Sequence, residues 1–257
     1  MFSRTKVAAL TAEFLGTGIL AYAVLAALTR NSIPAAFAVG LTLVALVFFF
    51  AKTSGAHFNP AITIGFWTAG KIKTLHAIAF VAVQIAGAFA AFKLFEYVTG
   101  NPLNVPEGNF SGRGLTAEIL GTFVLAFAVA AATMRKYTNG MAAGIVGSAI
   151  AIGVLLASTG SIALLNPALA LTILGTGSYV WGIYVVGAVV GAIVAINVYA
   201  LLFDDERKAL KAAVVEVTAT QIVEETPAKK VTATKVTKKT TTTTKAKTTA
   251  KKPVVKK

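Results

Sequence analysis

The chain has 257 residues, of which 56% are hydrophobic and only 13% are charged. Soluble domains carry about 25% charged residues, and from position 137 to position 203 this chain has none. A soluble domain needs polar groups over its surface, so this composition excludes that class and indicates a membrane protein. The absence of Cys excludes disulfides and thiolate-bound metals, and two His are too few for a His-rich metal site.

The net charge of +14 is unevenly distributed along the chain: residues 1–203 carry +6 and residues 204–257 carry +8. The segment from Lys229 to Lys257 consists mainly of Lys, Thr, Ala and Val and has no acidic residue. Such a segment has no apolar face to bury, so we predict that 204–257 is a disordered Lys/Thr-rich tail. We expect the tail to contact anionic lipid headgroups. Nucleic acid is a weaker alternative, because the tail has no aromatic residue to stack on bases.

Six apolar segments are long enough to cross the hydrocarbon core of a bilayer. They are Val7–Leu28, Ala35–Ala51, Thr74–Phe95, Leu115–Met134, Gly140–Ser158 and Tyr179–Phe203. The first is of full span length, so we do not interpret it as a cleavable signal peptide. Two further segments, Asn59–Thr68 and Asn166–Leu174, would reach only about 15 Å as helices, roughly half of that thickness. The sequence therefore predicts an all-α membrane protein with six transmembrane helices and two re-entrant half-helices.

Two short motifs occur twice. Ala-Glu-x-x-Gly-Thr begins at Ala12 and again at Ala117, and Asn-Pro-Ala begins at Asn59 and again at Asn166. Equivalent residues in the two copies are 105 and 107 positions apart, which indicates one structural unit built twice. Each copy has three spans, so the second starts from the opposite membrane face. We therefore predict inverted repeats over 5–98 and 115–203 within a channel domain at 1–203.

The Asn-Pro-Ala motif is a helix start, because Asn is a favourable N-cap and Pro suits the first helical position. The residues before it, Thr53–Phe58 and Ser161–Leu165, would then be non-helical backbone at membrane depth. Such backbone is tolerated only where protein covers it or where it lines a water-filled cavity. Two half-helices meeting there would point their positive ends and their Asn amide donors at one spot. That environment suits a neutral hydrogen-bond acceptor and repels cations, including protons.

With these motifs in place, the chain resembles the aquaporin family, also called the major intrinsic proteins. The segment Ser54–Ala61 is similar to the first Asn-Pro-Ala loop of that family almost letter for letter. The duplicated Ala-Glu-x-x-Gly-Thr motif and the run Gln84-x-x-Gly87-Ala88 also match, and the likeness extends over about residues 5–203. A single Asn-Pro-Ala would be weak evidence because it also occurs as an ordinary helix cap.

The resemblance implies roles for particular residues and an assembly. It implies a homotetramer with one pore in each subunit, and a brace on the re-entrant loops from Glu13 and Glu118. A proton relay is the weaker alternative for these two carboxyl groups. For His57, a hydrogen-bonded loop anchor is preferred over a pH gate. The implied pore motifs are Asn59, Pro60 and Ala61 in the first repeat and Asn166, Pro167 and Ala168 in the second.

The chain departs from the family at the outer constriction. Leu169 stands where the family usually has Arg, and Ala170 stands where glycerol channels usually have Asp. Counting back from each Asn places the other constriction residues at Val39, Val154 and Ala163, so the whole ring is expected to be apolar. Such a ring would pass water, small neutral solutes or dissolved gases, or would lose its water and close.

Lys and Arg in short loops are commonest on the cytoplasmic side. Placing both termini there gives that side Arg4, Lys6, Lys52, Lys71, Lys73, Arg135 and Lys136, and leaves only Arg30, Lys93 and Arg113 outside.

We predict a passive channel for water and small uncharged solutes that excludes ions and protons. The alternatives are a facilitator for glycerol or another small neutral solute, and a junction or scaffold protein with a nearly closed pore. No nucleophile, metal cluster or nucleotide loop points to an enzyme, and no cofactor is expected.

Overall fold

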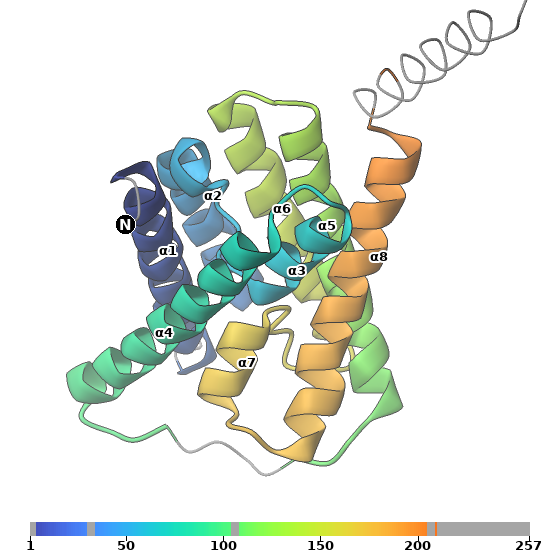
Figure 1. Cartoon of the computed structure of the whole chain (residues 1–257). Helices are drawn as coiled ribbons and strands as arrows, with labels where there is room; N and C mark the ends of the chain where they lie inside the picture. Colours follow the sequence, from blue (N-terminus) through green and yellow to red (C-terminus); the bar gives the residue numbers. More distant parts are fainter. Residues whose placement is uncertain (1–3, 30–33, 104–107, 205–208, 210–257) are drawn as a thin grey trace, which may run out of the picture. The chain divides into compact units, whose positions relative to one another are not determined.

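The computed structural model describes residues 4–29, 34–103, 108–204 and 209, and the elements within these ranges are helices (Figure 1). The long helices are α1 (Arg4–Thr29), α2 (Ala35–Ser54), α4 (Thr74–Thr99), α5 (Gly112–Met134), α6 (Asn139–Ala157), and the continuous pair η1 (Val180–Val185) and α8 (Val186–Leu202). The short helices are α3 (Pro60–Thr68) and α7 (Pro167–Ile173).

The predicted fold class is confirmed. Six helices are long and apolar enough to span a bilayer, with η1 and α8 counted as one, and α3 and α7 are too short. One predicted boundary is wrong: the backbone at Thr53 and Ser54 is helical, because α2 continues to a left-handed cap at Gly55 (φ 96°). The N–H of Gly55 donates to the carbonyl of Ala51 and closes the last turn.

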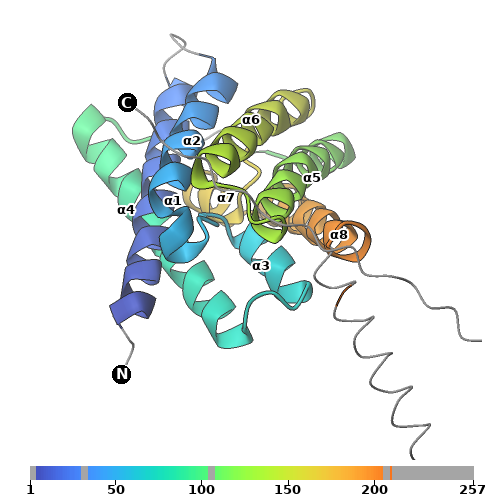
Figure 2. The same cartoon turned by 90° about the horizontal axis from the view of Figure 1, so that it is seen from above.

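The packing of the helices repeats in the two halves of the chain. Helix α1 packs against α2 and α4, and α5 packs in the same way against α6 and α8. The first set lies on one side of the molecule and the second on the other (Figure 2). Each short helix contacts its own half and also packs against a long helix of the opposite half, α3 on α8 and α7 on α4. This exchange, together with the α2–α6 and α3–α7 contacts, is the arrangement of an inverted repeat.

Glycines allow the long helices to cross closely, as is usual in membrane bundles. A Cβ atom on Gly87 of α4 would overlap the backbone carbonyl of Phe14 in α1. The equivalent crossing in the second half has Gly191 of α8, where a Cβ atom would lie 2.5 Å from the carbonyl oxygen of Ile119 in α5. Neither neighbour is a flexible side chain, so neither position has room for a larger residue.

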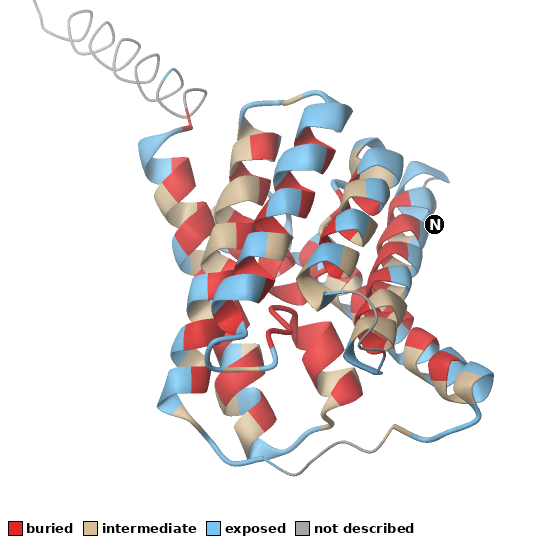
Figure 3. Ribbon diagram, turned by 180° about the vertical axis from the view of Figure 1, so that it is seen from behind, coloured by how far each residue is buried: buried red, intermediate tan, exposed pale blue. Residues whose placement is uncertain are grey.

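Buried residues gather in the middle of the bundle, where the short helices begin, and the outward faces of the long helices are exposed (Figure 3). Many of the exposed side chains are large and apolar, such as Phe49 at 66% and Leu155 at 64% exposure. A surface of this kind is what lipid tails cover in a membrane-spanning bundle.

The sixth span begins with a π-helical stretch, η1, that the sequence did not predict. A π-helix carries one extra residue per turn and is usually confined to a single turn. The segment Val180–Val185 contains no Pro, and its apolar composition fits an α-helix equally well, so the sequence offers no local signal for it.

The predicted tail from 204 to 257 falls almost entirely outside the described residues. Asp204, its first residue, is 2% exposed and pairs with Lys71 in the turn between α3 and α4. The end of α8 is thereby attached to the first half of the chain. Asn197 makes a second link, because its Nδ2 donates to Oγ1 of Thr68 at 2.8 Å.

The close crossing at Gly87 predicts that Gly87→Ala destabilises the folded protein in detergent. The added methyl group meets backbone of α1, so the helices must separate, at a cost of about 1–3 kcal/mol. A matched control is Gly144→Ala in α6, where a Cβ atom would meet nothing within 4 Å. Thermal unfolding followed by fluorescence should give a lower midpoint for the first variant alone. Equal midpoints would contradict the close-contact explanation.

Candidate functional site: the junction of the two half-helices

Each half-helix begins at its Asn-Pro-Ala motif. Asn59 has extended backbone, and its Oδ1 accepts a hydrogen bond from the N–H of Ala61 at 2.9 Å, with Pro60 at the first helical position. Asn166 repeats this geometry with the N–H of Ala168 at 3.0 Å. The side chains therefore cap their own helices, as the residue types predict.

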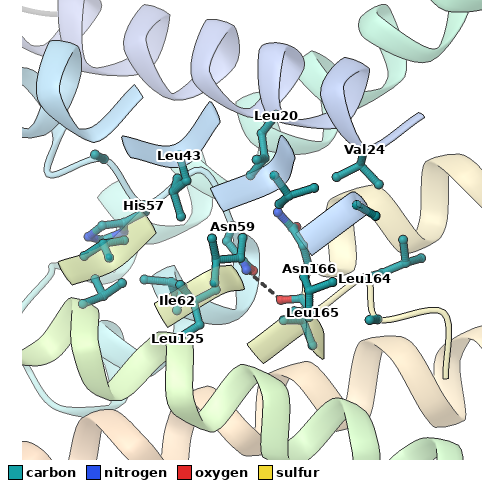
Figure 4. Close-up of a pocket in the computed structure, with 18 of the residues that line it drawn as sticks. Leu20, Val24, Leu43, His57, Asn59, Ile62, Leu125, Leu164, Leu165 and Asn166 are labelled. Carbon is teal, nitrogen blue, oxygen red and sulfur yellow. Dashed lines mark hydrogen bonds between the residues drawn. The ribbon is translucent and has the colours of Figure 1, made fainter. Parts of the chain in front are cut away.

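The amide groups of the two Asn also join the two halves. Nδ2 of Asn59 donates to the carbonyl of Leu165 at 2.8 Å, which Figure 4 shows as a dashed line. Reciprocally, Nδ2 of Asn166 donates to the carbonyl of Phe58 at 2.9 Å. The half-helices therefore meet end to end, and each Asn bonds to the residue that precedes the other Asn. An Asn amide has two N–H donors, so each side chain keeps a second one for the cavity that both line.

The loops before the two Asn residues have strained backbone. Ala56 and Phe58 in the first loop have φ of 54° and 48°, and Ala163 and Leu165 in the second have 57° and 52°. A non-glycine residue in the left-handed region costs on the order of 1 kcal/mol or more and persists only where its surroundings fix it. Both loops therefore need stabilising contacts.

The first loop receives these contacts from Glu13 of α1, which is completely buried. Its Oε1 accepts from the hydroxyl of Ser54 at 2.6 Å and from the N–H of His57 at 3.0 Å. Its Oε2 accepts from the N–H of Phe58 at 2.6 Å and from Nε2 of Gln84 at 2.8 Å. One carboxylate thus satisfies two backbone donors at membrane depth, where they would otherwise be costly.

Glu118 of α5 makes the equivalent contacts in the second loop and is also completely buried. Its Oε1 accepts from the hydroxyl of Ser161 at 2.6 Å and from the N–H of Leu164 at 3.1 Å. Its Oε2 accepts from the N–H of Leu165 at 2.8 Å. The two duplicated acidic residues therefore perform the same local task in both halves.

The two halves differ in the polar groups around these carboxylates. In the first half, Nε2 of Gln84 also donates to Oγ1 of Thr63 at 3.0 Å, and Nδ1 of His57 lies 3.1 Å from the same hydroxyl. The His57 ring is stacked on Phe66, with ring centres 5.0 Å apart. In the second half, the equivalent positions of Gln84, Thr63 and His57 are occupied by Ala188, Ala170 and Leu164. The first loop therefore sits in a polar network that the second loop lacks.

A narrow cavity runs past the junction and is lined mainly by aliphatic side chains (Figure 4). Three of the four predicted constriction residues line it: Val39, Val154 and Ala163. Leu169 is 1% exposed, belongs to the hydrophobic core, and is not among the lining residues. The cavity volume is about 30 Å³.

A second cavity continues on the side of the α5–α6 turn. It shares Ala56, Val129 and Val146 with the first and has a larger volume, about 210 Å³. Its lining also includes Lys136 and Tyr137. The two cavities together form a continuous row of lining residues on both sides of the Asn junction.

Several lining residues were not predicted from the sequence. They include Leu20, Val24 and Leu28 of α1, Leu43 of α2, Leu125 and Val129 of α5, and Val146 and Ile150 of α6. Many of them recur every fourth residue along a helix, so they form an apolar stripe on the face of that helix that lines the cavity. The stripe carries no signal in the sequence, because the lipid-facing sides of these helices are equally apolar. Within the described ranges, no group of three or more His, Cys, Asp or Glu is placed to hold a metal ion.

Comparisons with known proteins agree with this geometry. Residues 2–199 match the model of the family described as Major intrinsic protein. Aquaporin NIP1-1 of Zea mays is 34% identical over 208 residues, covering 74% of this chain and 73% of the relative. Aquaporin-4 of Homo sapiens is 32% identical over 176 residues, covering 64% of this chain and 54% of the relative. The X-ray structure of the aquaglyceroporin from Plasmodium falciparum superposes with a TM-score of 0.65 at 20% identity, covering 77% of this chain and 96% of that one.

The chain therefore belongs to the major intrinsic protein family and is a multi-pass membrane channel protein, not an enzyme. The family was identified correctly from the duplicated motifs. The solved structure is below 25% identity and supports the fold alone.

The carboxylate contacts predict that Glu118→Gln destabilises the protein more than a surface change of the same kind. The new amide NH2 group would face N–H and O–H donors that now bond to the carboxylate. Each buried donor left without an acceptor costs about 1–3 kcal/mol of folding free energy. The unfolding midpoint in detergent should fall by about 5 °C or more. Glu96→Gln is the control, because Glu96 forms an exposed pair with Lys93. If both variants unfold at the same temperature, Glu118 does not stabilise the loop.

Proposed function

We propose that the protein is a passive channel for water and small uncharged solutes that excludes ions and protons. The observation that carries the proposal is the end-to-end meeting of α3 and α7, with Asn59 and Asn166 lining a narrow cavity at the junction. Each Asn already uses one N–H on the opposite loop, so its amide orientation is fixed and its second N–H offers a preset donor to a molecule in the cavity.

The electrostatics of the junction favour neutral acceptors. Two helix N-termini that face one point concentrate positive potential there, equivalent to about half an elementary charge each. A water molecule can accept from the Asn donors, whereas a cation gains no acceptor and meets repulsion. A proton carried by the same water column meets the same barrier. We assign proton exclusion to this junction, because Arg is absent from the expected constriction position at Leu169.

The dimensions of the cavity favour water over glycerol. A cavity needs at least about 10–15 Å³ to hold a water molecule, so a volume of about 30 Å³ admits very few at once. A three-carbon polyol would have to displace side chains such as Val154 and Ile150. A glycerol facilitator is therefore the second candidate, and a scaffold with a nearly closed pore is the third. If the narrow aliphatic cavity lost its water, the pore would be closed, as the third candidate requires.

The constriction itself is proposed to consist of Val39, Val154 and Ala163. Leu169, the fourth residue of the expected ring, would act from behind the lining by filling the space that the family gives to Arg. Glu13 and Glu118 are proposed as braces of the two loops, and His57 as an anchor within the first. We also propose a homotetramer with a pore in each subunit, and an orientation that places both termini in the cytoplasm.

The proposal predicts faster osmotic shrinkage of proteoliposomes than of empty vesicles in stopped-flow light scattering, with an impermeant osmolyte and then with glycerol. Val154→Trp should return the water rate to the empty-vesicle level, because the indole fills the cavity. Ile152→Trp is the matched control, since Ile152 is on the same helix and is 49% exposed.

Each outcome selects one candidate. Acceleration of glycerol uptake equal to that of water would favour the glycerol facilitator. If the unmodified protein accelerates neither water nor glycerol flux, the scaffold protein with a nearly closed pore is favoured. If Val154→Trp and Ile152→Trp lower the water permeability equally, the cavity lined by Val154 is not the route that water takes.

The junction predicts that Asn166→Asp weakens the exclusion of protons and cations. The carboxylate adds negative charge where positive potential is proposed to form the barrier, and a barrier lowered by about 1.4 kcal/mol raises the flux roughly tenfold. Proton entry can be followed with a pH-sensitive dye inside proteoliposomes. Asn101→Asp, at an exposed site just after α4, serves as the control and should show no added leak. A proton flux unchanged by Asn166→Asp would contradict the electrostatic account.

A further inference from the structure

A second candidate binding site lies outside the pore, where α1 and α4 begin. It is a groove of about 350 Å³ on the surface of the bundle. Six residues line it: Lys6 and Leu10 from α1, Lys73 immediately before α4, and Leu75, His76 and Ala79 from α4.

The rim of the groove is basic. Lys6, Lys73 and His76 are all exposed, and none of the six lining residues is acidic. The ammonium group of neither lysine makes a hydrogen bond or ion pair with any residue in the described part of the chain, whereas that of nearby Lys71 pairs with Asp204. Two ammonium groups from different elements therefore face one groove without a carboxylate to neutralise them. Like charges brought together in this way are stabilised by an anion.

The other three lining residues of the groove are apolar. Leu75 is 76% exposed, the most exposed large apolar side chain on α4 after Tyr97, and Leu10 and Ala79 lie beside the basic rim. A groove lined by both cationic groups and exposed hydrocarbon matches a ligand that has an anionic head and an apolar body. A small soluble anion would leave the apolar part unused.

The topology places this groove at the edge of the hydrocarbon layer. Helix α1 crosses the membrane, α2 returns, and α3 does not cross, so α1 and α4 start from the same face. Lys6 lies in the first turn of α1, and Lys73 directly precedes α4. Phospholipid headgroups lie at this depth, and basic pockets between helices there bind acidic headgroups.

We propose that this groove binds one anionic phospholipid, with its phosphate held by Lys6 and Lys73 and its acyl chain lying along Leu75 and Ala79. Charge-assisted hydrogen bonds to phosphate oxygens are the strongest contacts that lysine makes. A zwitterionic lipid fits less well, because its own ammonium group adds to the positive charge of the rim. The proposal is independent of what the pore conducts.

The test uses the full-length protein in detergent and counts bound lipid by native mass spectrometry during titration with phosphatidylglycerol. Removing one lysine charge is expected to weaken binding about fivefold, and the variant Lys6→Gln/Lys73→Gln about thirtyfold, from about 1 kcal/mol per basic residue. The control Lys52→Gln/Arg113→Gln removes the same charge elsewhere and should bind like the unmodified protein. The basic tail is present in all three proteins, so it cannot produce the difference.

Three results would overturn the proposal. Equal weakening in both double variants would indicate general attraction to charge. Equal binding of phosphatidylcholine with the same acyl chains would show that the anionic head is not recognised. Equal protection of the protein from thermal unfolding by inorganic phosphate and by phosphatidylglycerol would assign the groove to a soluble anion.

A second measurement locates the lipid. A phosphatidylglycerol with a photoreactive group in its acyl chain should label the peptide that contains Leu75 and Ala79, and the label should be lost in Lys6→Gln/Lys73→Gln. Both lysines are exposed, so the variant should fold, and an unchanged thermal unfolding midpoint in lipid-free detergent would verify this. Labelling spread evenly over all helices would also contradict the proposal.

Discussion

The structure depends on one constraint: the backbone that lies inside a membrane must find its hydrogen-bond partners within the protein. The two loops that precede Asn59 and Asn166 are not helical, so their N–H and C=O groups have no partners in their own helices. The buried carboxylates of Glu13 and Glu118 accept the N–H groups, and the amide of each Asn donates to a carbonyl of the opposite loop. The two loops therefore stabilise each other, and neither half of the chain can form its part of the junction alone.

The same contacts connect stability with the proposed conduction. The amide of Asn166 is oriented by its cap and by its bond to the carbonyl of Phe58, so its remaining donor points to one place. A donor that is fixed before the solute arrives costs no ordering when the solute binds. The aliphatic side chains that line the rest of the path offer few polar contacts, which keeps a passing water from being held. The groove between α1 and α4 uses other residues and the opposite chemistry, with charged groups at the membrane edge.

Most of the fold could be predicted from the sequence because its signals are local. Span length, the Asn-Pro start and the duplicated Glu each depend on a few adjacent residues, and the predicted helices agree with the observed ones to within a few residues. The lining stripe of Leu20, Val24 and Leu28 could not be predicted, because in a membrane both the packed and the lipid-facing sides of a helix are apolar. The burial of Leu169 in the core, away from the cavity lining, depends on how α7 is rotated. The polar network of Gln84 depends on contacts between residues far apart in the chain. Neither is encoded in spacing.

The unequal surroundings of Glu13 and Glu118 have a consequence for the symmetry of the molecule. Two copies of the first half, paired as a homodimer, would bring two complete sets of Gln84, Thr63 and His57 to the centre. Two copies of the second half would bring Ala188, Ala170 and Leu164 and would leave each carboxylate with fewer donors. The pseudo-twofold axis therefore relates backbones but not interaction energies, and the halves are no longer interchangeable. Fusion into one chain permits this divergence, since the two halves no longer have to be identical.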